Sequence, residues 1–372
     1  MECKLFFTGD FVISQYKNQK NILSDQLKEK IKNCDIKCCN FEGPIIQNNY
    51  NKQRKIGPNI FNNEEIANIA IKDGFNLFCI ANNHIFDYGE QGMKKTIKYF
   101  KEKKVDYVGA DLEKNKIYEP ILKNINNQKI CIINVAENGF GAAVEDDKYG
   151  YAYMLHEKVL AQISKYSSIG YSVILICHAG VEHVEIPLPE IRNLYKKYID
   201  FGAELVIAHH PHVVQGWEKY KGKEIFYSLG NFAFDRGMGA QNTKSFSLLV
   251  TIKERNIYTE IVNTEFNGKE VDIIENKEKN SYLYEILNNS DKYEELLKEK
   301  ISEEYKKFKT TYERINVIYK GNIKERMKGF IKKYILRVDF QDIWLYHNIN
   351  IESHLWLMQR GSRMVLKKQK IL

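Results

Sequence analysis

Short apolar runs alternate with amphipathic stretches over the first 210 residues of the chain. The apolar runs are rich in Ile, Val, Phe and Cys and have the length of strands that are buried on both faces. They are residues 3–9, 36–41, 76–81, 129–135, 172–178 and 204–208. Between them, apolar residues recur at helical spacing over 22–33, 63–73, 90–104, 155–168 and 189–201. This alternation predicts an α/β fold with a largely parallel sheet.

The pattern changes after residue 212. Strand-like segments then follow one another through short polar turns, which predicts a second, more antiparallel sheet. These segments are 213–217, 224–229, 245–253 and 256–264. The sequence YKGKE at 220–224 is typical of a hairpin turn.

The last hundred residues differ in both pattern and charge. Apolar residues at helical spacing predict helices over 281–310 and 323–337, and the second has basic residues between its apolar ones. Residues 1–275 carry 35 basic and 35 acidic side chains, which balance. The whole net charge of +8 therefore comes from residues 276–372, which carry 21 basic and 13 acidic side chains. We therefore predict two domains, 1–275 and a basic helical extension at 276–372.

Composition sets the broad class of the protein. With 372 residues and 44% hydrophobic residues, the chain can bury a large core without disulfides. Its seven cysteines are odd in number and fall mostly in apolar runs, which indicates reduced, buried thiols. The first residues lack the apolar region of a signal peptide, and no stretch is apolar for long enough to span a bilayer. We expect a cytoplasmic protein.

Six of the nine histidines lie in three short clusters, each at the end of a predicted strand. The carboxyl ends of parallel strands meet at one edge of a sheet, so side chains that follow several strands gather there. Acids or amides accompany each cluster, and imidazole with carboxylate suits zinc, manganese or iron. The pattern predicts the site of a metal hydrolase.

The first cluster, ANNHIFDYG, follows an apolar strand directly. Asn83 can bind a metal through its amide oxygen. His84 can act as a general acid, with Asp87 to orient it or to stabilise its charge. The competing interpretation is a turn with a hydrogen-bonded histidine.

The second cluster, ICHAGVEH, places His178 at a strand end, with Glu182 and His183 shortly after. His178 is a candidate metal ligand, although a single histidine at a strand end is often structural. Glu182 would lie near the substrate or among the residues that support the ligands. His183 would face a substrate anion or solvent.

The third cluster, VIAHHPHVVQG, is the strongest local signal. His210 and His212 can direct both imidazoles to one site from an extended loop. His209 then points elsewhere and is a candidate for supporting the ligands. The alternative is a histidine-rich surface patch.

Isolated acids and amides give weaker signals. Asp10 follows a strand and a glycine, and Glu42 ends the next strand, so both can bind metal. Asn231, with Asp235 after it, can contact substrate or a ligand. Taken alone, Asp10 fits a turn aspartate better and Glu42 fits a surface glutamate better, whereas Asn231 fits a Gly-Asn turn equally well.

Taken in order, these motifs resemble the CapA-type poly-γ-glutamate capsule-synthesis family of the calcineurin-like metallophosphoesterase superfamily. The resemblance runs through TGDF, NFEGP, NNHIFDYG, HAGVEH, HHPHVVQG and SLGNFAFD and covers about residues 3–265. It implies an α/β fold: a four-layer sandwich of two mixed sheets flanked by helices. The helical extension lies outside the resemblance.

The resemblance also implies a centre of two divalent ions, Mn, Fe or Zn. Glu42 would take the place of the superfamily's bridging aspartate, and His84 would match the catalytic histidine. Asp10 and His212 would bind the first metal. The second metal would be bound by Asn83, His178 and His210.

The chain departs from the superfamily at two positions. The first motif usually has Asp-x-His, but Val12 stands at the histidine position, and Glu42 stands where Asp is usual. Capsule-type relatives share these departures. The two substitutions leave open whether the first metal site is occupied.

These features lead us to expect a metal-dependent hydrolase of a phosphoester or a related anionic polymer linkage, in capsule or exopolymer metabolism. The alternative is a non-catalytic module that binds an anionic polymer or a capsule-synthase complex. The basic helix 323–337 either lies on an anionic membrane at the inner face or packs on the catalytic domain with its lysines solvated. We expect no nucleic-acid partner, because no recognised motif accompanies the charge.

Overall fold

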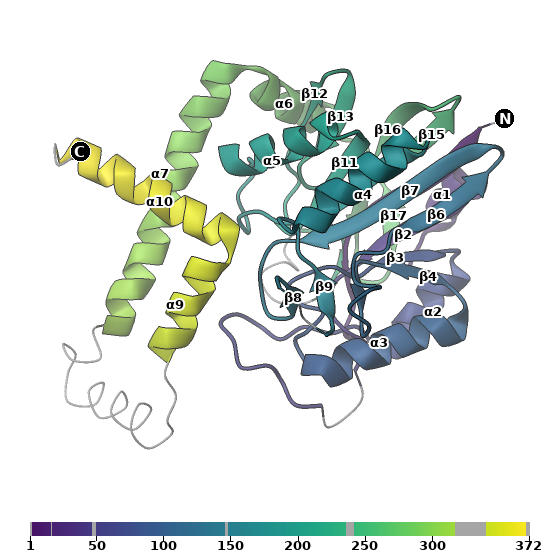
Figure 1. Ribbon diagram of the computed structural model, residues 1–372, viewed down its shortest axis with the longest axis horizontal. Coiled ribbons are helices and arrows are strands. Elements are labelled where there is room, and N and C mark those ends of the chain that lie inside the picture. Colours follow the sequence, from purple (N-terminus) through teal and green to yellow (C-terminus); the bar gives the residue numbers. More distant parts are fainter. Residues whose placement is uncertain are drawn as a thin grey trace.

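The computed structural model describes residues 2–15, 17–46, 50–145, 148–235, 242–316 and 340–369. Two mixed sheets pack face to face, with helices on the outer face of each (Figure 1). The chain thus has the α/β sandwich architecture that the resemblance implied.

The first sheet combines strands from the N-terminal part of the sandwich with strands that follow the second sheet in the sequence. These are β1 (Cys3–Val12), β2 (Ile36–Phe41), β3 (Leu77–Cys79), β4 (Asp106–Val108), β14 (Asn231–Phe234), β15 (Lys244–Lys253), β16 (Asn256–Phe266) and β17 (Val271–Ile273). Their order is β17-β16-β15-β1-β2-β3-β4, with β14 paired to the end of β1. β1 to β4 are parallel, whereas β15 to β17 are antiparallel to their neighbours.

The second sheet has the order β12-β13-β11-β10-β7-β6. Its strands are β6 (Ile121–Ile125), β7 (Gln128–Ala136), β10 (Ser172–His178), β11 (Ala203–His209), β12 (Trp217–Tyr220) and β13 (Lys223–Phe226). The central four are parallel, and both edge strands are antiparallel. A small third sheet contains β5 (Ala110–Asp111), β8 (Ala142–Ala143) and β9 (Gly150–Ala152).

The prediction of one parallel sheet followed by a separate antiparallel sheet is wrong. The six early strands are divided between the two sheets, and the later strands extend both of them. The predicted strand 213–217 is also wrong, because Val214 forms only an isolated bridge and β12 starts at Trp217. The hairpin at 220–224 is confirmed: Lys221 and Gly222 both have positive φ, as a tight β12–β13 turn requires.

Alternation along the strands assigns each side chain to one layer. Leu5 and Phe7 of β1 join the core between the sheets, whereas Phe6 joins the core beneath the outer helices. On the first sheet these helices are α1 (Asp25–Ile31), α2 (Glu64–Lys72) and α3 (Gly89–Lys103). On the second they are α4 (Glu157–Ser168) and α5 (Pro189–Asp200).

The C-terminal region is helical where the structure describes it. Its helices are α6 (Lys277–Asn288), α7 (Ser290–Asn316), α9 (Phe340–Asn350) and α10 (Glu352–Lys368). Asn289, with extended φ and ψ, divides the predicted helix 281–310 in two. The predicted helix 323–337 lies outside the described residues, and the predicted division at residue 275 stays a prediction.

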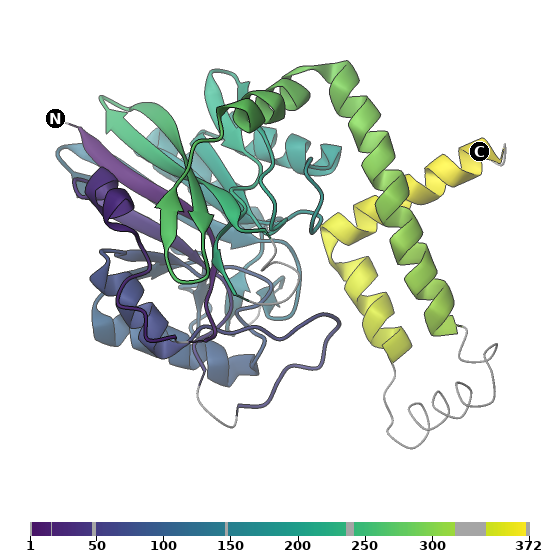
Figure 2. The ribbon, with the colours of Figure 1, turned by 180° about the vertical axis from the view of Figure 1, so that it is seen from behind.

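The C-terminal helices contact the sandwich through apolar side chains. Leu287, Leu297, Ile301 and Leu357 share one core cluster with the outer face of the second sheet. Figures 1 and 2 show α7 and α10 crossing beside the sandwich, with the α9–α10 corner against its edge. Among the described helices, none is both long and apolar enough to cross a membrane.

Candidate metal centre

Strand pairing brings the polar strand ends to one edge of the sandwich. In the first sheet Asp10 is paired with Asn40 on one side and with Asn231 on the other. In the second sheet His178 is paired with His209. The Asp10 N–H donates to the carbonyl of Gly230 at 2.8 Å. This approach requires Gly9, because a Cβ there would lie 2.1 Å from the same carbonyl oxygen.

Glu42 lies at the centre of the predicted ligands. Its Oε1 is 3.7 Å from Nε2 of His178 and 3.8 Å from Nε2 of His212. The same oxygen is 3.7 Å from Nε2 of His84. Glu42, His210 and His212 can also present their ligand atoms within 4.8 Å of one another. Residues from three separate motifs thus converge on one carboxylate.

Asp10 completes this cluster on the side of β1. Its Oδ2 lies 3.4 Å from Nδ1 of His212, and it accepts the backbone N–H of His210 at 3.3 Å. Its Oδ1 lies 3.9 Å from Nδ1 of His178 and accepts from the amide of Asn40 at 2.6 Å. The rings of His178 and His212 and the carboxylates of Asp10 and Glu42 therefore lie close enough together to bind one ion.

The Glu42 carboxylate has no hydrogen-bond partner among the described residues. It is fully buried, and neither oxygen accepts a hydrogen bond. A buried carboxylate without partners is costly, and native structures rarely contain one without a cation or an ordered water. Three imidazoles and a second carboxylate around it form the donor set of a transition-metal site. The residues present therefore fit a divalent metal ion.

Electrostatics within the cluster couple the acids to the histidines. Burial raises the pKa of Glu42 well above its ordinary value. Burial would lower the pKa of His212, but the charge of Glu42 and the hydrogen bond to Asp10 raise it to about 10. The pKa of Asp10 is lowered in spite of its burial by the hydrogen bond from His212 and the nearby histidines. His178, by contrast, has a pKa far below its ordinary value because it is buried beside His210.

The loop after β11 holds two of these histidines in an uncommon backbone conformation. His210 has φ 97° and His212 has φ 57°, a region that non-glycine residues rarely adopt. Such strain of about 1–3 kcal/mol per residue is typical of functional loops. It turns the two imidazoles of this tripeptide toward the same cluster, with ring centroids 5.9 Å apart.

Three further predicted residues contact the cluster. Asn83 places Oδ1 2.9 Å from Nε2 of His178, and Asn231 places Oδ1 2.9 Å from Nδ1 of His212. His209, predicted to support the ligands, has Nδ1 3.6 Å from Oδ1 of Asp10. Their roles stay predictions, but all three lie where a ligand or a group that orients one would lie.

His84 forms a separate pair at the edge of the cluster. Its Nδ1 lies 2.6 Å from Oδ2 of Asp87, and its Nε2 lies on the side of Glu42. Burial lowers the pKa of His84, and the charge of Asp87 opposes that shift. Lys55, itself buried, forms an ion pair with Asp87 and lies 3.0 Å from Nδ1 of His84. The Asp87 carboxylate also accepts the Ile60 N–H, which fixes it in place.

Two other predicted residues, Glu182 and His183, lie beside the cluster. Glu182 is exposed by surface area, but against its desolvation the charges of His210 and His212 lower its pKa to about 2, and the ring of His183 is 6.0 Å from that of His212. Asp235 instead accepts hydrogen bonds from the backbone of Ser14 and Gln15 and holds the loop after β1. Val12 packs with apolar neighbours, so the position where the superfamily has a histidine is part of a small apolar cluster here.

Three residues of the site escaped the sequence analysis. Glu137 directly follows the buried strand β7, the same signal that identified Asp10, and could have been found by it. Asn40 is a polar residue near the end of β2, which is a weaker form of that signal. Nothing in the polar loop around Lys55 distinguishes it from the neighbouring lysines. Glu137 lies 3.4 Å from Nε2 of His210, as a group that orients a ligand would.

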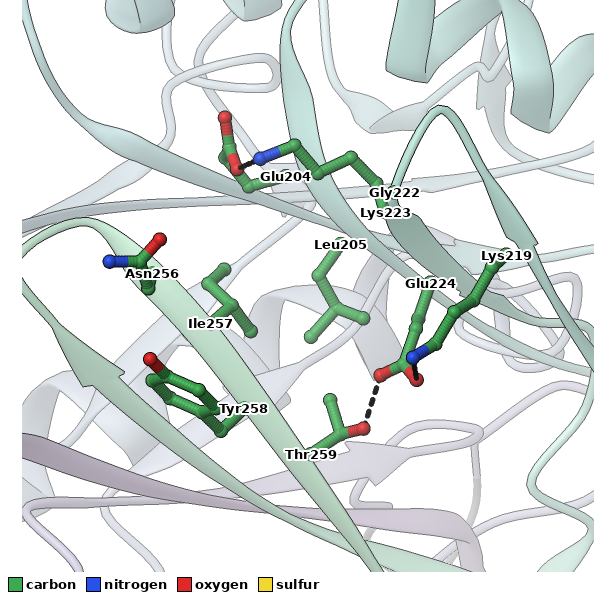
Figure 3. Close-up of a pocket in the computed structure, with 10 residues that line it drawn as sticks. All are labelled: Glu204, Leu205, Lys219, Gly222, Lys223, Glu224, Asn256, Ile257, Tyr258 and Thr259. Carbon is green, nitrogen blue, oxygen red and sulfur yellow. Dashed lines mark hydrogen bonds and ion pairs between the residues drawn. The ribbon is translucent and has the colours of Figure 1, made fainter.

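A surface pocket of about 320 Å³ lies at the opposite end of β11 (Figure 3). Its charged groups are mutually paired, Lys223 with Glu204 and Lys219 with Glu224. Thr259 donates a further hydrogen bond to Glu224. The pocket thus has little unbalanced charge with which to bind an ion, in contrast to the centre around Glu42.

Comparison with solved structures gives similar but distant folds. A putative 5'-nucleotidase from Staphylococcus aureus is 11% identical, with a TM-score of 0.44, and the match covers 76% of this chain and 57% of that one. A 5'-nucleotidase from Candida albicans is 12% identical, with a TM-score of 0.42, and the match covers 80% and 56%.

Comparison of sequences gives nearer relatives. Capsule biosynthesis protein CapA of Bacillus anthracis is 35% identical over 214 residues, which are 56% of this chain and 52% of that protein. PGA biosynthesis protein CapA of Bacillus subtilis is 32% identical over 244 residues, 62% of this chain and 63% of that protein. The matches thus span between half and two thirds of the length of these relatives.

A family model described as "Bacterial capsule synthesis protein PGA_cap" matches residues 4–236. That segment is more than half of the chain and contains every residue of the cluster described above. The chain therefore belongs to the bacterial capsule synthesis protein family.

Proposed function

We propose that this protein is a metal-dependent hydrolase that acts on a phosphoester or a related linkage of an anionic polymer in capsule or poly-γ-glutamate metabolism. The observation that carries the proposal is the buried Glu42 carboxylate, which lacks a hydrogen-bond partner among the described residues and is surrounded by imidazoles. It supports a cationic centre, and an anionic substrate is the natural ligand of such a centre.

Each predicted ligand has a place in this proposal. Glu42 would help to hold the divalent metal. Asp10 and His212 would hold one ion, and Asn83, His178 and His210 the other. Bound ions of this kind supply positive charge to an anionic substrate and lower the pKa of water.

His84 would act as the general acid. Its Nδ1 lies 2.6 Å from the Asp87 carboxylate, which suits an N–H donor at Nδ1 and leaves Nε2 on the side of Glu42 to exchange a proton with the leaving group. Lys55 pairs with Asp87 and would keep that carboxylate oriented.

The test is a substrate panel with metal removal and return. The full chain is depleted with a chelator, reloaded with Mn²⁺, Zn²⁺ or Fe²⁺, and assayed on phosphate monoesters, phosphate diesters and γ-glutamyl substrates. We expect turnover of at least one class that disappears with the chelator and returns with metal. A metal-loaded chain that turns over no member of the panel would contradict the proposal.

A non-catalytic role is the second candidate. Val12 at the usual histidine position favours it, because an apolar side chain packed with Ile60 and Phe234 cannot bind a metal. On this view the metal-loaded chain binds poly-γ-glutamate or a capsule-synthase complex without cleaving it. Polymer binding with no change in polymer length would support this alternative.

A further inference from the structure

Glu137 links the candidate metal centre to the C-terminal helix α10. One carboxylate oxygen, Oε1, accepts the Gly180 N–H at 3.1 Å and lies 3.4 Å from Nε2 of His210. The other, Oε2, accepts the Ser353 N–H at 3.1 Å, in the first turn of α10. A carboxylate at a helix N-terminus satisfies a free N–H and interacts well with the helix dipole. A helix outside the family match thus contacts the site through one side chain.

Further contacts fix the position of α10. Glu352 accepts the Asn138 N–H at 2.8 Å and the hydroxyl of Tyr153 at 2.5 Å, which ties the helix to the loop after β7. About two turns farther along, the Nε–H of Arg360 is shared between the two carboxylate oxygens of Glu190 on α5, both at 2.9 Å. The first turn of α10 is therefore held in a fixed position beside the candidate metal centre.

This arrangement brings two histidines of the helices to the centre. His347 on α9 and His354 on α10 have ring centroids 4.9 Å apart, and His354 is only 9% exposed. His354 interacts electrostatically with Glu182 and His210. Lys55 and His84 are near enough to contribute to the lowered pKa of His347. Figures 1 and 2 both show the α9–α10 corner against the sandwich edge.

The two histidines each have a ring nitrogen without a partner. Nδ1 of both His347 and His354 is buried and makes no hydrogen bond within the described part of the chain. Burial and the neighbouring His354 lower the pKa of His347 to about 3, burial also lowers the pKa of His354, and the charge of Glu182 opposes both shifts. Each ring is then neutral and offers one N–H donor. Buried polar groups are normally hydrogen-bonded, so the pair lacks a ligand.

An oxyanion suits the pair better than a metal ion does. In the described ranges, the only group of three or more His, Cys, Asp or Glu side chains close enough to hold a metal ion is Glu42, His210 and His212. A metal between His347 and His354 would have two protein ligands, whereas zinc sites usually have three or four. An oxyanion needs N–H donors and an excess of nearby positive charge. Lys55 is already paired with Asp87, and Glu182 acts on both histidines, so metal ions at the centre would have to supply this charge.

We propose that His347 and His354 form a subsite that binds an oxyanion of the substrate, a phosphate or a carboxylate group, beside the metal centre. The C-terminal helices are on this view part of the substrate site. The inference rests on the proposed function, because it places a second anionic group of the same substrate next to the hydrolytic centre.

The test measures anion binding to the metal-loaded full chain by calorimetry, with inorganic phosphate and glutarate as separate probes. His347→Ala and His354→Ala each remove one donor. We expect either change to weaken binding of at least one probe by about tenfold, the scale of one hydrogen bond to a charged group. The probe affected distinguishes a phosphate from a carboxylate subsite.

Two controls separate binding from folding. His354→Asn retains an amide near the position of Nδ1 and should restore most of the affinity that His354→Ala loses. His156→Asn, at the N-cap of α4, should leave both affinity and metal content unchanged. The alanine variants should also keep the metal content of the unsubstituted chain.

The outcomes distinguish this inference from the proposed function. Unchanged affinity for both probes in both alanine variants overturns the inference alone, as does a metal-loaded chain that binds neither probe. A tenfold loss in His354→Ala that His354→Asn does not restore also overturns it. A chain that takes up no divalent metal overturns the inference and the proposed function together.

Discussion

At the scale of single residues, the burial of Glu42 governs the chemistry of the centre. Glu42 and Asp10 are both fully buried, and their charges keep a proton on His212 although burial opposes it. A metal ion needs the unprotonated imidazole and the ionised carboxylate. The proton and the metal therefore compete for the same small volume.

This competition predicts a pH dependence of metal binding. Because the pKa of His212 is raised to about 10, the metal-free chain carries this proton at neutral pH, and metal binding must release it. Affinity for Zn²⁺ or Mn²⁺ should rise with pH between 6.5 and 8.0, by about tenfold per pH unit for each proton released. Calorimetry in buffers of different ionisation enthalpy measures the number of protons. An affinity that stays constant across this range would exclude the competition.

His84 gives a second prediction at this scale. His84→Asn removes the group that exchanges a proton but leaves the predicted ligands in place. We expect turnover of a substrate with a poor leaving group to fall by about 10²–10⁴-fold. Metal content should change little, and His156→Asn should have no effect on either quantity. Full activity of His84→Asn on such a substrate would rule out the acid role.

The sequence identified most of the residues in the cluster for a physical reason. Asp10, Glu42, His178 and His210 lie at or just after the ends of the predicted strands, and parallel strands bring such residues to one edge. His347 and His354 could not be found this way. They lie on helices more than 130 residues after the last cluster, and only the docking of α10 through Glu137 brings them near.

At the scale of elements, the crossing of α7 and α10 depends on one glycine. Gly361 lies on α10 where a Cβ would come within 2.4 Å of the Tyr305 ring on α7. Glycine normally costs an exposed helix about 1 kcal/mol relative to alanine. Here it permits the close approach that holds α10 against the rest of the molecule.

Gly361→Ala should therefore destabilise the protein in spite of its better helix propensity. We expect a loss of about 1–3 kcal/mol, the usual cost of overpacking, and a lower melting temperature. Ser362→Ala, the adjacent position on the same helix, should change stability by less than about 0.5 kcal/mol. A higher melting temperature for Gly361→Ala would show that the crossing is looser than the structure indicates.

A membrane contact through residues 323–337 stays a proposal. That segment lies outside the described residues, so its test rests on charge alone. Lys324, Lys328 and Lys332 changed together to Gln should weaken binding to anionic vesicles by about 100-fold, at about 1 kcal/mol for each lysine. The same change at Lys298, Lys306 and Lys309 of α7 is the matched control. Equal sedimentation of the two variants with anionic vesicles would exclude this segment as the contact.

Local sequence patterns predicted the positions of the strands and helices better than they predicted which strands pair with one another. β1 and β10 were identified by apolar runs, and α2 to α5 by helical periodicity. The division into two sheets could not be derived, because a strand that is apolar on both faces, such as β1, accepts a parallel neighbour on one edge and an antiparallel one on the other. The residue pattern of β15 and β16 predicts that they pair with each other, but it does not predict which of the two sheets they join.

At the scale of the whole molecule, both sheets and the C-terminal helices meet at the candidate centre. The first sheet contributes Asp10 and Glu42, the second contributes His178 and the β11 loop, and α10 contacts Glu137 behind His210. The hydrogen bond between Glu137 and Ser353, which are 216 positions apart, joins the centre to these helices. Substitutions at the centre should be read together with the packing of the helices around it.

The most direct test of this account is the metal content of the full chain, purified without chelator and measured by inductively coupled plasma mass spectrometry. We predict bound Mn, Fe or Zn in the unsubstituted chain and in His156→Asn. His178→Ala and His210→Ala should each lose metal while retaining the circular dichroism of the folded chain. An unsubstituted chain without divalent metal, or two alanine variants with its full metal content, would contradict the account.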